Sequence, residues 1–243
     1  MLMATTETLG SPLAPIFAPS VGSSAKLSAA PRRSAGTYDL LLRSADQANS
    51  SLLKRVLDIF GSLALLLFLL PTFALIAIAI KLDSPGPVFF RQERYGRGCK
   101  IFRMFKFRSM VCMESTGAFV QASQDDCRIT RVGRFLRATS LDELPQLINV
   151  LRGEMSVVGP RPHAVAMDDY FAASFPNYMS RYLVRPGLTG LAQISGYRGP
   201  TVGLEPIRRR VKCDLAYIRR WSLLSDMKVL VRTPLSLFGP NAF

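Results

Sequence analysis

The longest apolar run in the chain covers residues 59–80, IFGSLALLLFLLPTFALIAIAI, which contain no charged side chain. At 1.5 Å per residue, a straight helix of this length extends roughly 33 Å, which is about the thickness of the hydrocarbon core of a bilayer. A core helix of a soluble protein is the weaker alternative. The pattern therefore predicts a membrane-inserted helix within residues 51–82.

Two features bear on how that helix meets the membrane. Pro71 lies near its middle, where a proline removes a backbone hydrogen bond and kinks the helix. Both flanks are basic, with Lys54 and Arg55 before the run and Lys81 among several cations after it, so the distribution of positive charge gives no direction across the membrane. We therefore expect a re-entrant helix bent at Pro71, with both ends in the cytoplasm. A conventional span is the alternative.

The segments on either side of the apolar run differ in pattern. Residues 1–50 are rich in Ala, Ser, Pro and Thr without a sustained apolar period, which predicts a disordered tail. Residues 87–110 contain two runs of alternating apolar and polar positions around Gly96 and Gly98, which predicts a β-hairpin.

The sequence of the C-terminal half alternates between helical patterns and segments interrupted by glycine. We expect a helix over 128–152, a short strand and rigid loop over 155–162, and loop and strand over 184–199. Residues 205–232 predict an amphipathic helix, which could lie on a membrane surface or cover a soluble core. Its apolar side holds Ile207, Val211, Leu215 and Ile218, its basic side holds Arg208, Arg209, Lys212 and Arg219, and Trp221 lies nearby.

Composition adds a charge argument. Lys and Arg number 31 against 17 Asp and Glu, giving a formal net charge of +14, which points to an anionic partner such as nucleic acid, anionic lipid or a phosphorylated substrate. The four cysteines show no metal-ligand spacing and there is one histidine, His163, so a zinc site is not expected and His163 is taken as structural. Scattered thiols favour a reducing cytoplasm.

An adjacent pair of acids stands out in this basic chain, in ATSLDELPQL (138–147). Ser140 and Glu143 match a capping box. With Ser140 as N-cap, however, Pro145 would be the fifth helical residue and would leave a carbonyl without its donor. With Asp142 as N-cap, Pro145 falls third, where no intrahelical donor is needed. We therefore expect Asp142 to begin a helix, with both acids at the positive end of its dipole.

Three arginines precede the pair: Arg131, Arg134 and Arg137. Cations close to the acids would lower their pKa values. An ionised aspartate among cations can attack a phosphorus atom or bind a divalent metal, although position alone establishes neither role and helix capping is the commoner use of such acids.

Several segments, in order, resemble the bacterial sugar transferases, the monotopic polyprenyl-phosphate phosphoglycosyl transferases. They are KRVLDIFGSLALLLFLLPTFALIAIAIKLDSPGPVFFRQERYGRG, KFRSM, TSLDELPQLINVLRGEMSVVGPRP and RPGLTGLAQISG. The ending, with GYRGPT, CDLAYIRRWSLLSDMKVL and GPNAF, most resembles the undecaprenyl-phosphate glucose phosphotransferase branch. The resemblance runs from about Lys54 to the C-terminus, leaving only residues 1–50 outside it.

The resemblance implies a role for each matching residue. Asp142 would be the nucleophile on the β-phosphate of a UDP-sugar, and Glu143 would help to hold Mg²⁺. Lys106, Arg137, Arg161 and Arg185 would lie near phosphates, while Gly187 and Gly190 would let backbone N–H groups approach them. Fixed cations and a metal would screen the negative charge of the pyrophosphate, so that an anionic carboxylate can approach it.

The resemblance also implies an overall reaction: sugar 1-phosphate transfer from a UDP-sugar to undecaprenyl phosphate, through a covalent aspartyl intermediate with UMP release, initiating exopolysaccharide synthesis. Glucose 1-phosphate is the expected sugar, and galactose 1-phosphate is the alternative. A membrane-tethered nucleic-acid binder and an inactive assembly scaffold are the rival functions. No nucleic-acid-binding motif is present, so nucleic acid is not an expected partner.

Together these expectations define an α+β, mostly helical fold with a re-entrant membrane helix, a small β-hairpin and amphipathic interfacial helices. The expected divisions are a disordered tail (1–50), the membrane-inserted re-entrant helix (51–82) and a catalytic domain associated with membrane lipids (83–243). The expected location is the cytoplasmic face of the bacterial inner membrane. Whether the chain forms a homo-oligomer is left open.

Overall fold

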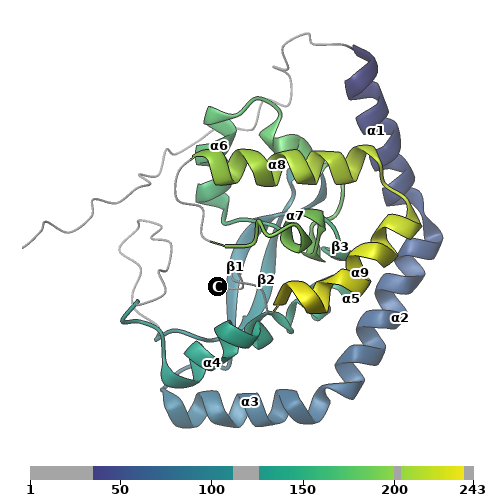
Figure 1. The fold of residues 1–243 in the computed structure, drawn as a ribbon. Coiled ribbons are helices and arrows are strands. Elements are labelled where there is room, and N and C mark those ends of the chain that lie inside the picture. The colour runs from purple at the N-terminus through teal and green to yellow at the C-terminus, as the bar shows by residue number, and fades with distance from the viewer. Residues whose placement is uncertain (1–34, 112–125, 200–203, 238–243) are drawn as a thin grey trace, which may run out of the picture.

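The computed structural model describes residues 35–111, 126–199 and 204–237, which are mostly helical and contain two small sheets (Figure 1). In chain order the elements are α1 (Ala35–Ser50), α2 (Leu52–Phe68), α3 (Leu70–Asp83), β1 (Phe89–Tyr95), η1 (Arg97–Cys99), β2 (Ile101–Phe107), α4 (Arg131–Thr139), η2 (Leu141–Glu143), α5 (Gln146–Leu151), β3 (Ser156–Val158), α6 (Val165–Ser174), η3 (Tyr178–Leu183), β4 (Gly187–Thr189), α7 (Leu191–Ile194), α8 (Leu204–Arg219) and α9 (Leu223–Leu237).

The predicted hairpin is confirmed. Strands β1 and β2 pair antiparallel, from Phe89 opposite Phe107 to Tyr95 opposite Ile101. Gly98 lies in the connecting turn with φ of +65°, a backbone conformation that glycine adopts without steric cost. The predicted strand after residue 155 is also present as β3, which pairs parallel with β4.

The apolar run forms two helices rather than one. Helices α2 and α3 meet at a bend of 61°, and Pro71 lies in the first turn of α3, where its missing N–H costs little. The predicted helix–break–helix and its position at Pro71 are therefore confirmed. Among the described residues no single helix is long and apolar enough to cross a bilayer. By length and composition the bent pair could.

Helix α2 buries three polar side chains against the rest of the fold. Lys54 forms a 2.6 Å ion pair with Asp226 of α9, and Asp58 accepts hydrogen bonds from the hydroxyl of Ser156 and the N–H of Val157 in β3. The third side chain, Ser62, is fully buried. These contacts fix the direction in which the apolar helices leave the domain.

The expectation of disorder over 1–50 is wrong for residues 35–50, which form α1. Its apolar residues Leu41, Ala45 and Ala48 recur at helical spacing and are buried in a core shared with Ile218 of α8. The small size of the two alanines hides this stripe in a composition that otherwise resembles a tail. Residues 1–34 lie outside the described part of the chain.

Two predicted helices are each interrupted. The segment 128–152 contains α4, the short turn η2 and α5, because Ser140 adopts a left-handed conformation that ends α4. The segment 205–232 divides into α8 and α9 around residues 220–222. Ile207 and Ile218 are fully buried and Trp221 is nearly so, which means that the apolar side of α8 covers a core.

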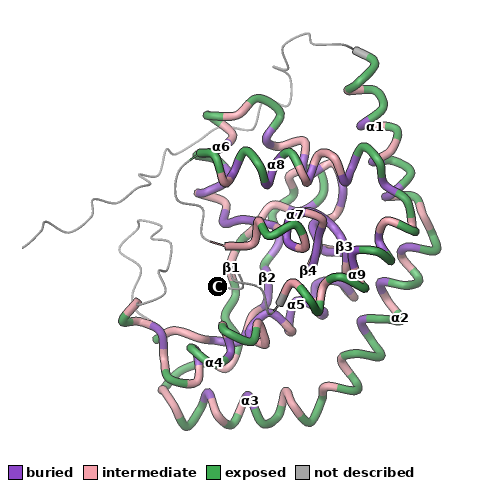
Figure 2. The backbone as a smooth tube through the Cα atoms, in the orientation of Figure 1, coloured by how far each residue is buried: buried purple, intermediate pink, exposed green. Residues whose placement is uncertain are grey.

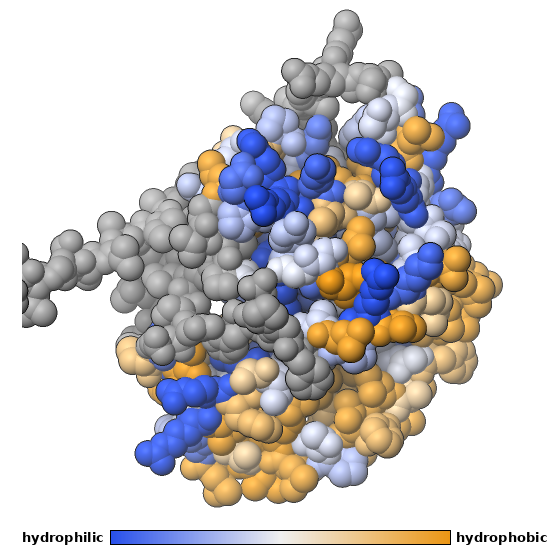
Figure 3. Space-filling model, in the orientation of Figure 1, coloured by the Kyte–Doolittle hydropathy of each residue, from blue (hydrophilic) through white to orange (hydrophobic). Residues whose placement is uncertain are grey.

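Apolar side chains gather at one end of the molecule. Figure 3 shows an apolar surface over α2 and α3, while hydrophilic residues cover the region of α8 at the opposite end. Figure 2 shows that the outer sides of α2 and α3 are largely exposed. Phe68, Leu75 and Leu82 are each more than three-fifths exposed. An exposed apolar surface of this kind marks an interaction site.

Candidate active site

The two adjacent acids lie in η2, between α4 and α5. Ser140 ends α4 with φ of +60°, and the N–H of Glu143 then bonds to the carbonyl of Ser140 at 3.2 Å. The prediction that Asp142 caps a helix is therefore wrong: the acids lie in a short 3₁₀ turn of their own, and Pro145 immediately precedes α5. The argument from Pro145 holds in one respect, since its missing N–H falls where no helical donor is required.

Glu143 is held by two cations. Arg161 donates to both of its carboxylate oxygens, with Nη1 at 2.8 Å from Oε2, and Lys106 Nζ lies 2.9 Å from Oε1. Burial by itself would raise the pKa of Glu143, but Arg161 and Lys106 outweigh it and hold the pKa well below its ordinary value. Glu143 is therefore ionised and fixed in place.

Asp142 is less completely matched. Among the described residues the only cation within ion-pair range is Lys106, whose Nζ lies 3.9 Å from Oδ2. Burial raises the pKa of Asp142, and this effect outweighs the cations that lower it, of which Lys106 is the strongest. The expectation that nearby cations lower both pKa values thus holds for Glu143 and is wrong for Asp142, because desolvation dominates there.

The cations come from two separate elements. Lys106 lies on β2, which is fixed to α5 by Asn149: its side chain accepts from the N–H of Phe105 at 2.9 Å and donates to the carbonyl of Arg103 at 2.9 Å. Arg161 lies in the loop after β3, and its own carbonyl accepts from Nη2 of Arg181 at 2.7 Å. Both cations are therefore positioned by buried contacts.

Gly187 has a different role from the one expected, and Gly190 shares in it. The N–H of Gly187 bonds to the carbonyl of Pro160 at 2.9 Å, so it is not available to a phosphate. A Cβ atom at Gly187 would lie 2.1 Å from the N atom of Gly159. A Cβ atom at Gly190 would lie 2.2 Å from the carbonyl oxygen of Gly159. These glycines let two chain segments touch, and that contact places the loop carrying Arg161.

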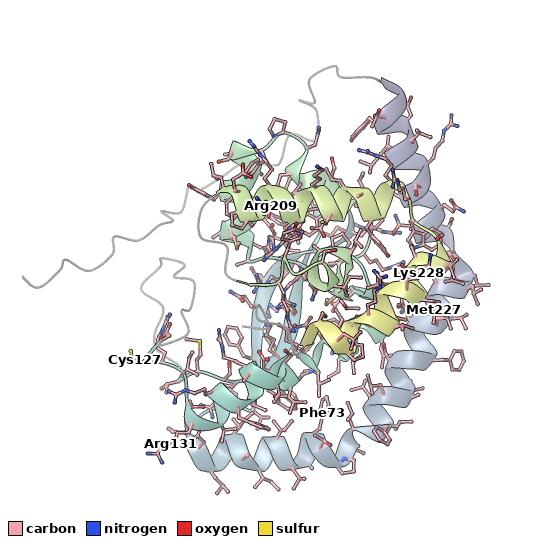
Figure 4. All side chains as sticks on the ribbon, in the orientation of Figure 1. Phe73, Cys127, Arg131, Arg209, Met227 and Lys228 are labelled. Carbon is pink, nitrogen blue, oxygen red and sulfur yellow. The ribbon has the colours of Figure 1, made fainter. Side chains whose placement is uncertain are left out.

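The arginines expected before the pair divide into two groups. Arg137 is near enough to lower the pKa of Asp142 and contacts Sδ of Met110 at 3.7 Å. Arg131 and Arg134 are exposed, and Figure 4 shows Arg131 pointing away from the body of the molecule. Only Arg137 joins the site.

The structure does not bring Arg185 to the acids. Its Nε donates to the carbonyl of Gly153 at 3.1 Å, beyond the C-terminal end of α5, whereas the acids precede the N-terminal end of that helix. Its charged neighbours are Arg97, Arg55 and Asp58. The sequence carried no information about this separation.

Two further arginines near the acids were not singled out in the sequence. Arg198 donates to the hydroxyl of Ser140 at 2.6 Å, and Glu143 and Asp142 are its acidic neighbours. Arg94 on β1 faces Asp168 and Glu143, and burial lowers its pKa to about 10. Both arginines lie inside segments quoted for the resemblance, RQERYG and GYRGPT, but nothing in the sequence distinguishes them from surface cations. We call Lys106, Asp142, Glu143, Arg161 and Arg198 the carboxylate cluster.

Behind this cluster lies a second buried group of charges, which we call the His163 network: His163, Asp168, Tyr178, Arg181, Tyr182, Arg210 and Asp214. The imidazole of His163 lies 2.7 Å from a nitrogen of Arg181 and 3.0 Å from one of Arg210. Burial, followed by these two arginines, holds the pKa of His163 well below its ordinary value. His163 is thus a neutral internal group, consistent with the structural role expected for it.

The donor set fits Mg²⁺ in part. Mg²⁺ prefers oxygen ligands and is typically bound through one or two carboxylates together with substrate phosphates and water. Asp142 and Glu143 supply two carboxylates, and a carboxylate has about four acceptor positions, of which Glu143 uses three on its cations. Among the described residues no group of three or more His, Cys, Asp or Glu could hold a metal, so the remaining ligands would have to come from substrate and water.

Comparison with known proteins bears on what this site does. A family model described as bacterial sugar transferase matches residues 49–240. The UDP-glucose:undecaprenyl-phosphate glucose-1-phosphate transferase of Caulobacter vibrioides is 54% identical over 191 residues, which are 78% of this chain and 72% of that protein. The Escherichia coli protein of the same name is 53% identical over 182 residues, 75% of this chain and 39% of its own length.

A third relative is the exopolysaccharide production protein PSS of Rhizobium leguminosarum bv. phaseoli, 47% identical over 190 residues, with 76% of this chain and 94% of that protein covered. The match therefore covers nearly all of the Rhizobium relative and about two-fifths of the Escherichia coli one. The expectation of a sugar transferase is confirmed: the chain belongs to the bacterial sugar transferase family.

Proposed function

We propose that the protein transfers glucose 1-phosphate from UDP-glucose to undecaprenyl phosphate and so initiates synthesis of an exopolysaccharide. The observation that carries the proposal is the buried pair Asp142–Glu143, held among cations from β2 and from the loop after β3, in a chain about half identical to transferases named for this reaction. The proteins named for UDP-galactose or N-acetylgalactosamine transfer are less similar, at 39% and 41% identity, which favours glucose.

Asp142 is the proposed nucleophile. Its carboxylate oxygen attacks the β-phosphorus of UDP-glucose, a new P–O bond forms, and the bond from that phosphorus to the bridging oxygen breaks to release UMP. An oxygen of undecaprenyl phosphate then attacks the same phosphorus and displaces the carboxylate. Asp142 suits this role better than Glu143, because the Glu143 oxygens are occupied by Arg161 and Lys106.

The cations have a defined task in this proposal. Lys106 lies between both acids, 2.9 Å from Glu143 and 3.9 Å from Asp142, so it is placed to neutralise a phosphate approaching Asp142. Arg161 is fixed by Glu143 and offers a planar set of donors suited to phosphate oxygens. Glu143 would help to hold Mg²⁺, with other ligands from substrate and water, and Mg²⁺ when bound would neutralise charge on the pyrophosphate.

The bent apolar helices suggest where the reaction occurs. We propose that α2 and α3 enter a bacterial inner membrane from its cytoplasmic face and return to that face, in contact with membrane lipids. The exposed apolar surface over these helices supports this location, and the 61° bend supports re-entry over a span. The site would then lie near the headgroups, where the phosphate of the lipid substrate resides.

The proposed reaction is tested by assaying purified protein with a panel of UDP-sugars, undecaprenyl phosphate and Mg²⁺, and measuring UMP. UDP-glucose should give the fastest release, and omission of Mg²⁺ should abolish it. Mass spectrometry of protein incubated with UDP-glucose alone should show one added hexose phosphate on Asp142. Product formed without any adduct on Asp142 would contradict the nucleophile role, and preference for UDP-galactose would contradict the sugar assignment.

The location is tested separately with single cysteines placed at residues 50 and 84, which flank the two helices. Both should be protected from a membrane-impermeant thiol reagent added to intact cells, and both should react after the inner membrane is opened. Reaction of either one in intact cells would indicate a span.

A further inference from the structure

Arg198 is placed at the acids by a loop that the fold fixes firmly. The residue follows α7, and its Nη2 donates to the hydroxyl of Ser140, two residues before Asp142, at 2.6 Å. Arg210 of α8 donates to the carbonyls of Tyr197 and Gly199, both at 2.8 Å, and so holds the backbone on each side of Arg198. The side chain therefore reaches the acids from a constrained backbone.

Arg198 lacks an ion-pair partner among the described residues, although its charge helps to lower the pKa of Glu143. Lys106 and Arg161 both form ion pairs with Glu143, whereas Arg198 forms no ion pair with any residue that the structure describes. Glu143 and Asp142 are nevertheless its acidic neighbours, and burial lowers its pKa. A partly buried guanidinium without a carboxylate partner is costly unless an anionic ligand completes it.

The direction from which Arg198 approaches indicates which phosphate it would meet. Helix α3 packs against α4 on one side of the acids, through Ile76, Ile80 and Leu136. Arg198 comes from the loop between α7 and α8, and Figure 1 shows α8 at the opposite end of the molecule from α3. A lipid substrate would reach Asp142 from the side of α3, and a water-soluble nucleotide from the side of Arg198.

We propose that Arg198 binds the phosphate of the UDP-sugar that leaves with UMP, while Lys106 and Arg161 serve the phosphate that is transferred. This inference rests on the proposed function, and it adds a residue for the nucleotide product. It requires Arg198 to contribute to the affinity for UMP and for UDP-glucose, and not to the affinity for undecaprenyl phosphate.

The test is direct binding of UMP to the full chain in detergent micelles, measured by calorimetry, combined with steady-state kinetics. Arg198→Gln should weaken UMP binding and raise KM for UDP-glucose by roughly tenfold to a hundredfold, the range for loss of a hydrogen bond to a charged group. KM for undecaprenyl phosphate should not change. Arg208→Gln is the matched control, since Arg208 is an exposed arginine of α8 whose contacts among the described residues are an ion pair with Glu205 and the ring of Phe175, and it should leave all three values unchanged.

The outcomes separate this inference from the proposed function. Unchanged UMP affinity in Arg198→Gln, or an effect on undecaprenyl phosphate alone, overturns the inference while wild-type turnover stands. A wild-type chain that binds no UMP overturns it as well. If the wild type binds UMP through Arg198 but releases none from UDP-glucose, the proposed reaction fails and the nucleotide-phosphate site remains. Arg198→Lys keeps the charge and should recover part of the lost affinity, which a purely structural role through Ser140 would not require.

Discussion

The carboxylate cluster and the His163 network are both buried groups of acids and cations, but the Arg181–Asp214 pair of the network is more closely matched than Asp142 or Arg198 of the cluster. Arg181 in the network has no exposed surface and donates to Asp214 through two nitrogens, at 2.6 Å and 3.1 Å. Asp168 accepts from Tyr178 at 2.8 Å and from Tyr182 at 2.6 Å. In the carboxylate cluster Asp142 has one cation at 3.9 Å, and Arg198 forms no ion pair with described residues.

This difference separates a scaffold from a binding site. A buried charge that is fully hydrogen-bonded is fixed, and its loss leaves a partner uncompensated. A buried charge that is incompletely matched raises the free energy of the folded chain, and a ligand of complementary charge lowers it again. The two groups are also connected, because Arg181 of the network donates a hydrogen bond to the carbonyl of Arg161 in the cluster.

The largest expected effect is on activity. Asp142→Asn should lower the rate of UMP release by about 10³-fold or more, as loss of a nucleophile does in other covalent enzymes. Its stability should change little, because Lys106, the one cation within ion-pair range of Asp142 among the described residues, keeps its closer partner Glu143 when the charge of Asp142 is lost. Turnover and the midpoint of thermal unfolding measure the two effects. A variant that lost activity together with its fold would contradict this assignment.

In the His163 network, by contrast, we expect the loss of a carboxylate to lower the stability of the fold. Asp214→Asn leaves Arg181 buried without its carboxylate, and removal of one partner from a buried ion pair costs about 3–5 kcal/mol of unfolding free energy. Urea unfolding in detergent measures the change, with Asp142→Asn as the control of the same chemistry in the other group. Equal stability of the two variants would remove the distinction between scaffold and site.

The sequence predicted local structure where the pattern of residues was sufficient. Pro71 in an uncharged apolar run gave the helix break, and alternating runs around Gly96 and Gly98 gave the hairpin. Helix α1 was missed because its buried stripe is built largely from alanine. The interruption at Ser140 was missed because it depends on a left-handed backbone conformation that serine adopts only rarely.

The sequence also predicted only part of the site. Lys106, Arg161 and the two acids were named from motifs that resemble a family, and the structure brings all four together. Arg185 was named on the same basis and lies at the other end of α5. Arg198 was not named, because its position depends on Arg210 holding the loop, a contact between residues that no local pattern relates.

A smaller effect is expected from pH. Burial raises the pKa of Asp142, while Lys106, Arg137 and Arg161 lower it and Glu143 raises it further. Because the nucleophile must be ionised, activity is retained above this raised pKa and falls as pH falls through it. The acidic limb of kcat/KM against pH should therefore lie above the ordinary pKa of an aspartate. Lys106→Met removes the cation that lowers the pKa most, so it should move the limb of its residual activity to still higher pH.

The smallest effect is expected from an ion pair of an acid and an arginine whose side chains are mostly exposed. Glu93 and Arg103 lie directly opposite each other on the hairpin at 3.6 Å, with side chains 57% and 70% exposed. Water screens such a pair, so Glu93→Gln should change the unfolding free energy by less than about 0.5 kcal/mol and leave turnover unaltered. Urea unfolding of this variant beside Asp214→Asn isolates the contribution of burial. If both variants lost similar stability, charge pairing alone would account for the His163 network, and incomplete matching would cease to identify Asp142 and Arg198 as ligand-binding groups.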